Sequence, residues 1–385
     1  MIDDREDIRL LRDSVRRFVD QHMPREAARK WDKENIFPRD VHNALGKLGV
    51  MGLTIPTEYG GQGVDISATM AVIEELARRS TAVACPYIMA ACYAGMNLVE
   101  SGSESQKRAL LPKVAKGELL FAYGLSEPNV GGDLATVETT ARREGNRILL
   151  NGTKRWCTGA HIADYVFCLA RTGPKEDRYK NLTIFLVPPK SKGVTITPLD
   201  HLGIRGVETN DAIFEDVELG EDAILGGPDK WNQGWKQLAG RALEVEKLEL
   251  SACALGLAEA ACADAFDYAE TRVQFGKPIG THQAIRHAIA DARTKTLAMR
   301  LMLYHAAGLV QDRKPSALES SMTKLFCCEG AAEVTLACQR IMGAYGLSDL
   351  MDMERYVRDA ISLPIVGGSS NMQKNNIANR LKLAE

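Results

Sequence analysis

The stretch comprising residues 121–141 has the residue types of a loop that binds a flat ligand. An apolar run stops at Ser126, and the paired glycines Gly131 and Gly132 follow. Paired glycines let a backbone approach a bulky ligand closely, because no Cβ stands in the way. The hydroxyl of Ser126 and the amides around it can donate hydrogen bonds to a planar, acceptor-rich ring. The segment therefore predicts a ring-binding loop, with a glycine-rich surface turn as the alternative.

The composition argues against several classes of protein. The 385 residues carry a net charge of −2 with both signs interspersed, which predicts no nucleic-acid or membrane partner. The longest apolar stretches are interrupted by charge, so we expect no transmembrane span. The N-terminus is acidic and lacks the apolar core of a signal peptide, which favours a cytoplasmic location. Nine scattered cysteines and isolated histidines predict reduced thiols and no metal site.

Three regions of the chain differ in the spacing of their apolar residues. Residues 1–121 favour helices, with apolar residues at steps of three and four. Residues 122–235 contain short β-type runs separated by Gly, Pro and Asn-Gly turns, which predicts an antiparallel sheet. Residues 236–385 return to helical patterns that are apolar on most sides, as inside a helix bundle. This order predicts an α+β fold with a β domain between two helical domains.

Six further segments match, in order, motifs of one flavoprotein family. They are residues 51–65, 151–172, 202–219, 272–283, 339–347 and 367–373. Together with residues 121–141 they resemble the acyl-CoA dehydrogenase family over nearly the whole chain. The resemblance implies three domains, an N-terminal helical domain (1–121), a middle β domain (122–235) and a C-terminal four-helix bundle (236–385). It also implies FAD as the cofactor.

The resemblance assigns residues in two groups to the cofactor. Leu125 and Ser126 would lie at one edge of the flavin ring and Trp156 and Thr158 near its other side. The family often has Ser where this chain has Gly132, so backbone amides would have to replace that hydroxyl. The remaining positions that match are Gly131, Ser369 and Asn371, and at the adenine end Arg272, Phe275, Gln283, Gln339 and Gly343. In the family the adenine-end groups reach a flavin of a neighbouring subunit, which implies a homodimer or homotetramer.

The catalytic base is the point at which this sequence departs from the family. Most members carry a Glu immediately before the Gly-Ser of the C-terminal motif, and this chain has Gly367 there. Residues 241–256 resemble the helix on which the isovaleryl-type and long-chain branches place their Glu, and the matching residue is Glu246. On a helix Glu246 shares a face with Leu250, so it should point inward, where desolvation raises a carboxyl pKa.

Two neighbouring carboxylates are alternative candidates for the base. A further alternative is that Glu246 and both of these neighbours are only surface charges at the start of a helix. The competitors are Glu244 and Glu249. In the family the backbone N–H at this place binds the thioester carbonyl, so the resemblance implies this role for Gly367, which needs no side chain. Removing a Glu from this place also leaves space for a branched or bulky acyl group.

The resemblance implies an FAD-dependent dehydrogenase that converts an acyl-CoA to its 2-enoyl-CoA and passes electrons to an electron-transfer flavoprotein. Gly-Gly-Ser at residues 367–369 also resembles the crotonobetainyl-CoA reductase branch, so enoyl-CoA reduction is the first alternative. A thioester on a carrier protein, an FAD-binding subunit of a heteromeric dehydrogenase, and a flavin oxidase or monooxygenase are the others. The acyl chain, its branching and the direction of reaction stay open.

Overall fold

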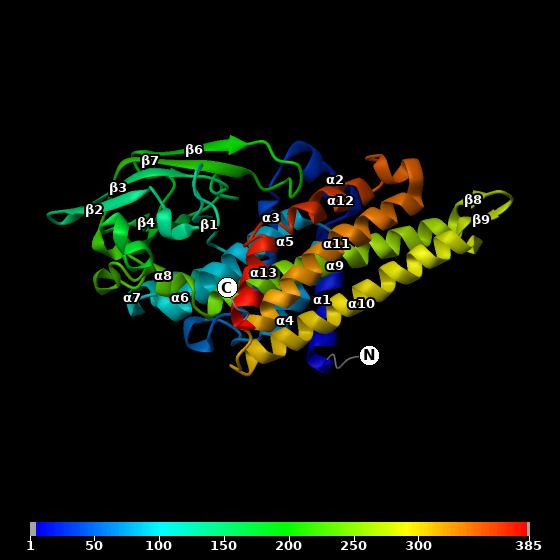
Figure 1. The fold of residues 1–385 in the computed structure, drawn as a ribbon, viewed down its shortest axis with the longest axis horizontal. Coiled ribbons are helices and arrows are strands. Elements are labelled where there is room, and N and C mark those ends of the chain that lie inside the picture. Colours follow the sequence, from blue (N-terminus) through cyan, green and yellow to red (C-terminus); the bar gives the residue numbers. More distant parts are fainter. Residues whose placement is uncertain (1–4, 383–385) are drawn as a thin grey trace.

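The computed structural model describes residues 5–382 and places a β-sheet domain beside a long helical body (Figure 1). This arrangement confirms the predicted α+β fold. The N-terminal region is helical, as its apolar spacing predicts. Its main elements are α1 (Glu6–His22), α2 (Arg25–Glu34), α3 (Arg39–Leu48), α4 (Ile66–Ala77), α5 (Thr81–Tyr87), the π-helical segment η3 (Ile88–Ala94), α6 (Gly95–Ser101) and α7 (Glu104–Ala115).

The middle region forms one seven-stranded sheet with the order β1-β4-β2-β3-β7-β6, and β5 pairs with β4. Its strands are β1 (Phe121–Gly124), β2 (Thr140–Glu144), β3 (Arg147–Lys154), β4 (Tyr165–Arg171), β5 (Leu182–Val187), β6 (Val194–Leu199) and β7 (Thr209–Leu219).

The prediction of an antiparallel sheet is wrong for one part of it. Strand β4 runs parallel to β1 and to the first residue of β2, Thr140, whereas the other pairs are antiparallel. Tight turns predict antiparallel pairs, and the turn at Gly145 does join β2 and β3 as an antiparallel hairpin. The long connection over residues 125–139 instead carries the chain away from β1, so that β4 can pair beside it in the same direction.

The C-terminal region returns to helices, three of them long. Helix α9 is buried on most sides and contacts α11, α4 and α10. Because its surface is apolar nearly all round, it forms the centre of the bundle. The elements are α8 (Gly234–Leu238), α9 (Arg241–Thr271), β8 (Val273–Gln274), β9 (Lys277–Pro278), α10 (Gln283–Gln311), α11 (Ala317–Met342), η9 (Gly343–Leu347), α12 (Met353–Ser362) and α13 (Ser370–Arg380).

One helical stretch, Thr81–Ser101, is long and apolar enough to cross a membrane by length and composition. The expectation that charges interrupt every such run is therefore wrong here. The apolar window is 83% buried inside the protein, and the stretch comprises α5, η3 and α6. Its η3 segment contacts α9, so its apolar surface faces the helical core.

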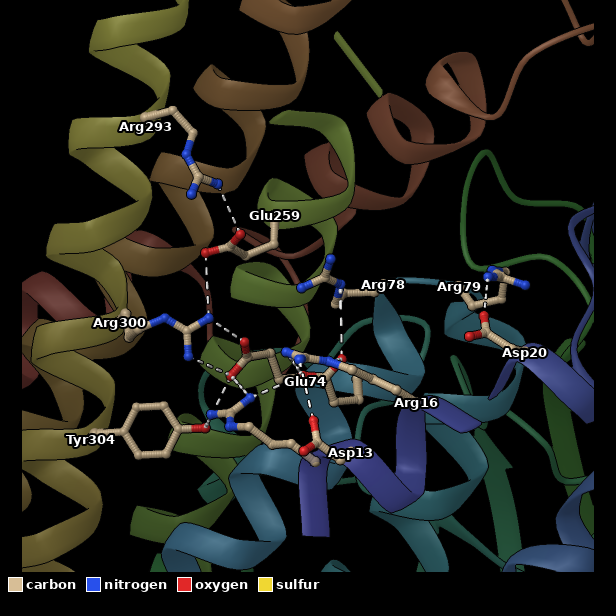
Figure 2. A network of polar contacts seen from close by, with 12 residues as sticks. Asp13, Arg16, Asp20, Glu74, Arg78, Arg79, Glu259, Arg293, Arg300 and Tyr304 are labelled. Carbon is tan, nitrogen blue, oxygen red and sulfur yellow. Dashed lines mark hydrogen bonds and ion pairs between the residues drawn. The ribbon is translucent and has the colours of Figure 1, made fainter. Parts of the chain in front are cut away.

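A buried ionic network fixes α9 relative to its neighbours (Figure 2). Glu74 of α4 accepts a hydrogen bond from Tyr304 at 3.0 Å and pairs with Arg300, both on α10. Arg12 of α1 lies 2.9 Å from the same carboxylate, and Arg300 also contacts Glu259 of α9. Burial alone would raise the pKa of Glu74, but Arg12 and Arg300 more than offset it and lower this pKa. The network therefore ties four helices together, α1, α4, α9 and α10.

Candidate active site

The loop after β1 is held in place by a buried ion pair. The Nζ atom of Lys154, at the end of β3, donates to the carbonyl of Leu125 at 3.1 Å and to Glu127 Oε1 at 2.8 Å. The carboxylate of Glu127 also accepts from the backbone N–H of Thr139 at 2.8 Å. The carbonyl of Ser126 accepts from Arg155, while its hydroxyl has no hydrogen-bond partner within residues 5–382. A fixed backbone thus presents a free Ser126 donor at the surface.

Trp156 and Thr158 follow directly after the strand that anchors this loop. Trp156 has a positive φ of 65° and 59% of its surface is exposed. A large exposed aromatic ring on a left-handed backbone shows that Trp156 is not a core residue of the sheet. Thr158 lies 3.0 Å from the hydroxyl of Thr209 of β7 and keeps partial exposure. Both residues can therefore contact a bound ring.

Helix α13 brings the C-terminal motif to the glycine pair of the middle domain. Gly131 lies in open space, whereas a Cβ on Gly132 would lie 3.2 Å from the sulfur of Met372. Ser369 caps α13, and its hydroxyl accepts from the N–H of Met372, so it is already engaged. Asn371, in the first turn of α13, is exposed. Segments far apart in sequence, the glycine loop and α13, therefore meet at one place.

Glu246 lies in the second turn of α9, half-buried between the sheet-side loop and the bundle. Burial raises its pKa, while a hydrogen bond from Tyr93 and the charges of Lys247 and Lys324 oppose this shift. The carboxylate thus has the inward location that the helical spacing predicts. A carboxyl group with a raised pKa is a stronger proton acceptor than one with its ordinary value.

Gly367 lies directly against Glu246. Its φ is +60°, and a Cβ at this position would lie 3.3 Å from Glu246 Oε1 and would overlap the Cδ1 atom of Leu250. The two places where the family carries its catalytic Glu are thus neighbours in space, and only one is occupied by a carboxylate here. The backbone N–H of Gly367 has no hydrogen-bond partner among the described residues. It is therefore available to a ligand.

Lys324, which no sequence motif indicates, positions this loop. Its side chain is fully buried in α11, and Nζ donates to the carbonyls of Leu363, Val366 and Gly368 at 3.1, 2.9 and 2.8 Å. Burial lowers the pKa of Lys324, whereas Cys328 and Glu246 act in the opposite direction. The sequence feature that could have indicated Lys324 is a single lysine within an apolar helical run. Such a lysine is expected to be buried, and a buried ammonium group needs hydrogen-bond acceptors.

The two competing carboxylates have different environments. Glu244 forms an ion pair with Lys247, with Nζ and Oε2 2.8 Å apart, and lies near Arg380. Glu249 is 1% exposed, and neither of its oxygens has a hydrogen-bond partner within the part of the chain that the structure describes. Glu244 is thus neutralised by its partner, and Glu249 is too deep for direct contact with solvent. Of the three, Glu246 alone lies against Gly367.

The residues predicted at the adenine end lie elsewhere. Arg272 directly precedes β8, and Phe275 lies in the turn between β8 and β9, at the end of the bundle remote from the sheet (Figure 1). Gln283 begins α10. The guanidinium of Arg272 lies 5.9 Å from the ring centre of Tyr345 in η9. Phe275 is 94% exposed with a φ of 53°. The same end carries Gln339, whose Nε2 donates to the carbonyl of Gly346, and Gly343, which is exposed.

The predicted cofactor residues therefore form two separate groups in one chain. The sheet-side group offers donors and one exposed indole, which suits a flat heterocycle with acceptor atoms. The hairpin group offers a guanidinium and an exposed aromatic ring, which suits a diphosphate and an adenine. The residues present fit FAD in two parts. No group of three or more His, Cys, Asp or Glu residues within residues 5–382 has the arrangement of a metal site.

Family comparisons agree with the fold and with the site. The N-terminal, middle and C-terminal domains of acyl-CoA dehydrogenase match residues 5–118, 122–217 and 232–382. The chain therefore belongs to the acyl-CoA dehydrogenase family, a family of flavoprotein oxidoreductases that act on CH–CH bonds. This confirms the family resemblance and the enzyme class predicted from the sequence motifs.

Individual relatives cover the chain almost completely. It is 34% identical to the 3-(aryl)acrylate reductase of Clostridium sporogenes over 97% of each chain. It is 35% identical to the mitochondrial short-chain specific acyl-CoA dehydrogenase of Homo sapiens, over 91% of this chain and 84% of that one. The solved structure of butyryl-CoA dehydrogenase from Megasphaera elsdenii is 29% identical, matches 100% of both chains and has a TM-score of 0.93.

Proposed function

We propose that this enzyme dehydrogenates an acyl-CoA thioester to the 2-enoyl-CoA, with Glu246 as the catalytic base. The observation that carries the proposal is the contact between Glu246 and Gly367. It combines a half-buried carboxylate of raised pKa with a backbone N–H that lacks a protein partner. A base for the α-proton and a donor for the thioester oxygen are the two groups that this chain must supply.

The chemistry of these two groups follows from their positions. Glu246 takes the α-proton, and the electron pair of the broken C–H bond moves toward the thioester oxygen. The N–H of Gly367 donates to that oxygen and stabilises its developing charge. Lys324 holds the carbonyls on both sides of Gly367, which keeps this N–H in place. Bound FAD would accept the hydride from the β-carbon.

The cofactor would be held by two subunits. Leu125, Ser126, Trp156 and Thr158 would hold the flavin ring of one subunit, with Gly131, Gly132, Ser369 and Asn371 beside it. The hairpin group, Arg272, Phe275, Gln283, Gln339 and Gly343, would reach the diphosphate and adenine of a partner subunit's FAD. The separation of the two groups in one chain supports this division and a homodimer or homotetramer. We propose an electron-transfer flavoprotein as the oxidant and a cytoplasmic location.

Replacing Glu246 by Gln tests the assignment of the base. Glu246→Gln keeps the shape of the side chain and removes its ability to accept a proton. We expect bound FAD to be retained and kcat to fall about a hundredfold to ten-thousandfold, the usual contribution of a general base. Glu244→Gln is the matched control on the same helix and should stay within a few-fold of wild type. Wild-type turnover in Glu246→Gln would overturn the assignment.

Enoyl-CoA reduction is the second candidate. It is supported by the relative named 3-(aryl)acrylate reductase and by Gly-Gly-Ser at residues 367–369. In that direction Glu246 would donate its proton to the α-carbon, a role that a raised pKa also supports. Initial rates with matched acyl-CoA and enoyl-CoA substrates, measured with an electron acceptor and an electron donor respectively, distinguish the two directions.

A further inference from the structure

Glu249 is a buried carboxyl group that the proposed mechanism does not use. It lies three residues after Glu246 on α9, so the two side chains share a face of the helix, with Cβ atoms about 5–6 Å apart. It is 1% exposed, and neither oxygen has a hydrogen-bond partner within residues 5–382. Burial raises its pKa well above the ordinary value, and the nearby Cys92 thiol, a weak donor, opposes this only partly.

Two tyrosines, Tyr93 and Tyr123, lie near both this carboxyl group and the base. Burial is the main cause that raises the pKa of Tyr93 and Tyr123, and the charges of both Glu246 and Glu249 raise these pKa values further. The two rings meet edge to face with centroids 5.0 Å apart, and Nδ2 of Asn97 donates to the hydroxyl of Tyr123. Both tyrosines keep partial exposure. The region beyond Glu246 is therefore polar.

Glu249 differs from the carboxylates that stabilise the fold. Glu74 is equally buried, but it contacts Arg12, Arg300 and Tyr304. A buried polar group without a partner costs free energy and is rare in folded proteins, so its retention requires an explanation. An aliphatic acyl chain ending beside Glu249 would leave it with no donor stronger than the Cys92 thiol. An acyl chain ending in a hydrogen-bond donor would provide one.

We propose that Glu249 determines acyl specificity by accepting a hydrogen bond from a hydroxyl or ammonium group at the end of the acyl chain remote from the thioester. This inference rests on the proposed function, because Glu246 places the α-carbon of the substrate. The donor lies about one helical turn further along α9, which corresponds to a short acyl chain. The proton donor of the contact is the substrate, and no bond is made or broken there.

The test uses the FAD-loaded enzyme and matched pairs of thioesters. In each pair a terminal methyl is replaced by a hydroxyl, as in valeryl-CoA against ω-hydroxybutyryl-CoA and hexanoyl-CoA against ω-hydroxyvaleryl-CoA. We expect kcat/KM to favour the hydroxylated member about two- to tenfold, the range of one neutral hydrogen bond. Glu249→Leu should reverse this preference, because it removes the acceptor and leaves an apolar end. ω-Aminovaleryl-CoA distinguishes an ammonium ligand from a hydroxyl ligand.

Glu249→Gln is the conservative variant. It retains an acceptor for a hydroxyl, so the hydroxyl preference should survive in it, while a preference for the ammonium compound should be lost with the carboxylate. Equal kcat/KM within each wild-type pair, unchanged in Glu249→Leu, would overturn the assignment of Glu249. If Glu249→Leu does not fold, the kcat/KM preferences of wild type and of Glu249→Gln still test whether Glu249 accepts this hydrogen bond. Failure of the proposed function has a different result, since no thioester in the panel would then be oxidised.

Discussion

Replacing Gly367 by Ala places a methyl group at the most crowded point of the candidate site. The Cβ atom would lie 3.3 Å from Glu246 Oε1 and would overlap Cδ1 of Leu250. The backbone φ of +60° is in addition a left-handed conformation that residues other than glycine adopt at a cost. The substitution therefore perturbs the loop and the base together, although it changes a residue without a side chain.

The magnitude follows from these two effects. The left-handed conformation costs roughly 1–2 kcal/mol, and overpacking a well-packed position costs about 1–3 kcal/mol. Their sum, about 2–5 kcal/mol, corresponds to a decrease in Tm of roughly 2–6 °C for an unfolding entropy near 2 cal/mol/K per residue. A displacement of about 1 Å between the loop and the base lowers the rate about a hundredfold. We therefore expect kcat/KM to fall by about that factor while FAD stays bound.

The assay compares Tm and kcat/KM of the FAD-loaded variants. Gly308→Ala in α10 is the control, because a Cβ there meets nothing within 4 Å. It should leave both quantities near wild type. The double variant Gly367→Ala/Leu250→Ala removes the overlapping Cδ1 and should recover part of the lost activity. A Gly367→Ala enzyme with wild-type Tm and kcat/KM would refute the reasoning that this position requires glycine.

Four further perturbations have expected outcomes. Lys324→Met removes a charge that lowers the pKa of Glu246, so the acid limb of the kcat/KM–pH profile should move to higher pH; an unmoved limb would contradict this. Burial, with a smaller effect of Arg39, lowers the pKa of His42 to about 4, so protonation destabilises the fold. Denaturant titrations should therefore show the free energy of unfolding falling by about 3 kcal/mol as pH falls from ~6.5 to ~4, and this component of the fall should be absent in His42→Leu. Glu74→Gln should lower the free energy of unfolding by about 3–5 kcal/mol, because Arg12 and Arg300 lose a shared partner; an unchanged denaturation midpoint would argue against the network's role. Arg272→Ala should weaken FAD retention on gel filtration more than it lowers kcat of the FAD-saturated enzyme, and equal retention would exclude it from the cofactor site.

Local patterns predicted the elements of the fold well. Apolar spacing predicted helices over residues 236–385, and the same helical spacing put Glu246 on the inward face of α9, where the structure has it half-buried. The parallel pairing of β4 with β1 could not be read in this way, because strand pairing depends on where the long connection at residues 125–139 carries the chain. Turn residues predict pairing only between the two strands that the turn connects directly.

Contacts between distant segments were beyond prediction from the sequence for a related reason. The three carbonyls around Lys324 belong to a loop that meets α11 only after the chain has folded. The meeting of Gly132 with Met372 and of Gly367 with Glu246 likewise joins elements from different regions. Sequence motifs indicated candidate residues at these places. No local sequence pattern, however, reveals that the N–H of Gly367 is free or that the buried Glu249 carboxyl lacks a hydrogen-bond partner among the described residues.

The proposed reaction is the oxidation of an acyl thioester by this chain, with Glu246 as the base. Its most direct test is anaerobic mixing of the FAD-loaded protein with a panel of short, branched, hydroxylated and aromatic acyl-CoAs, followed by the flavin absorbance. Bleaching of the flavin by at least one thioester in wild type, and its loss in Glu246→Gln with FAD still bound, is the predicted result. Equal bleaching in wild type and Glu246→Gln, or an FAD-loaded wild type that no thioester bleaches, would contradict the account.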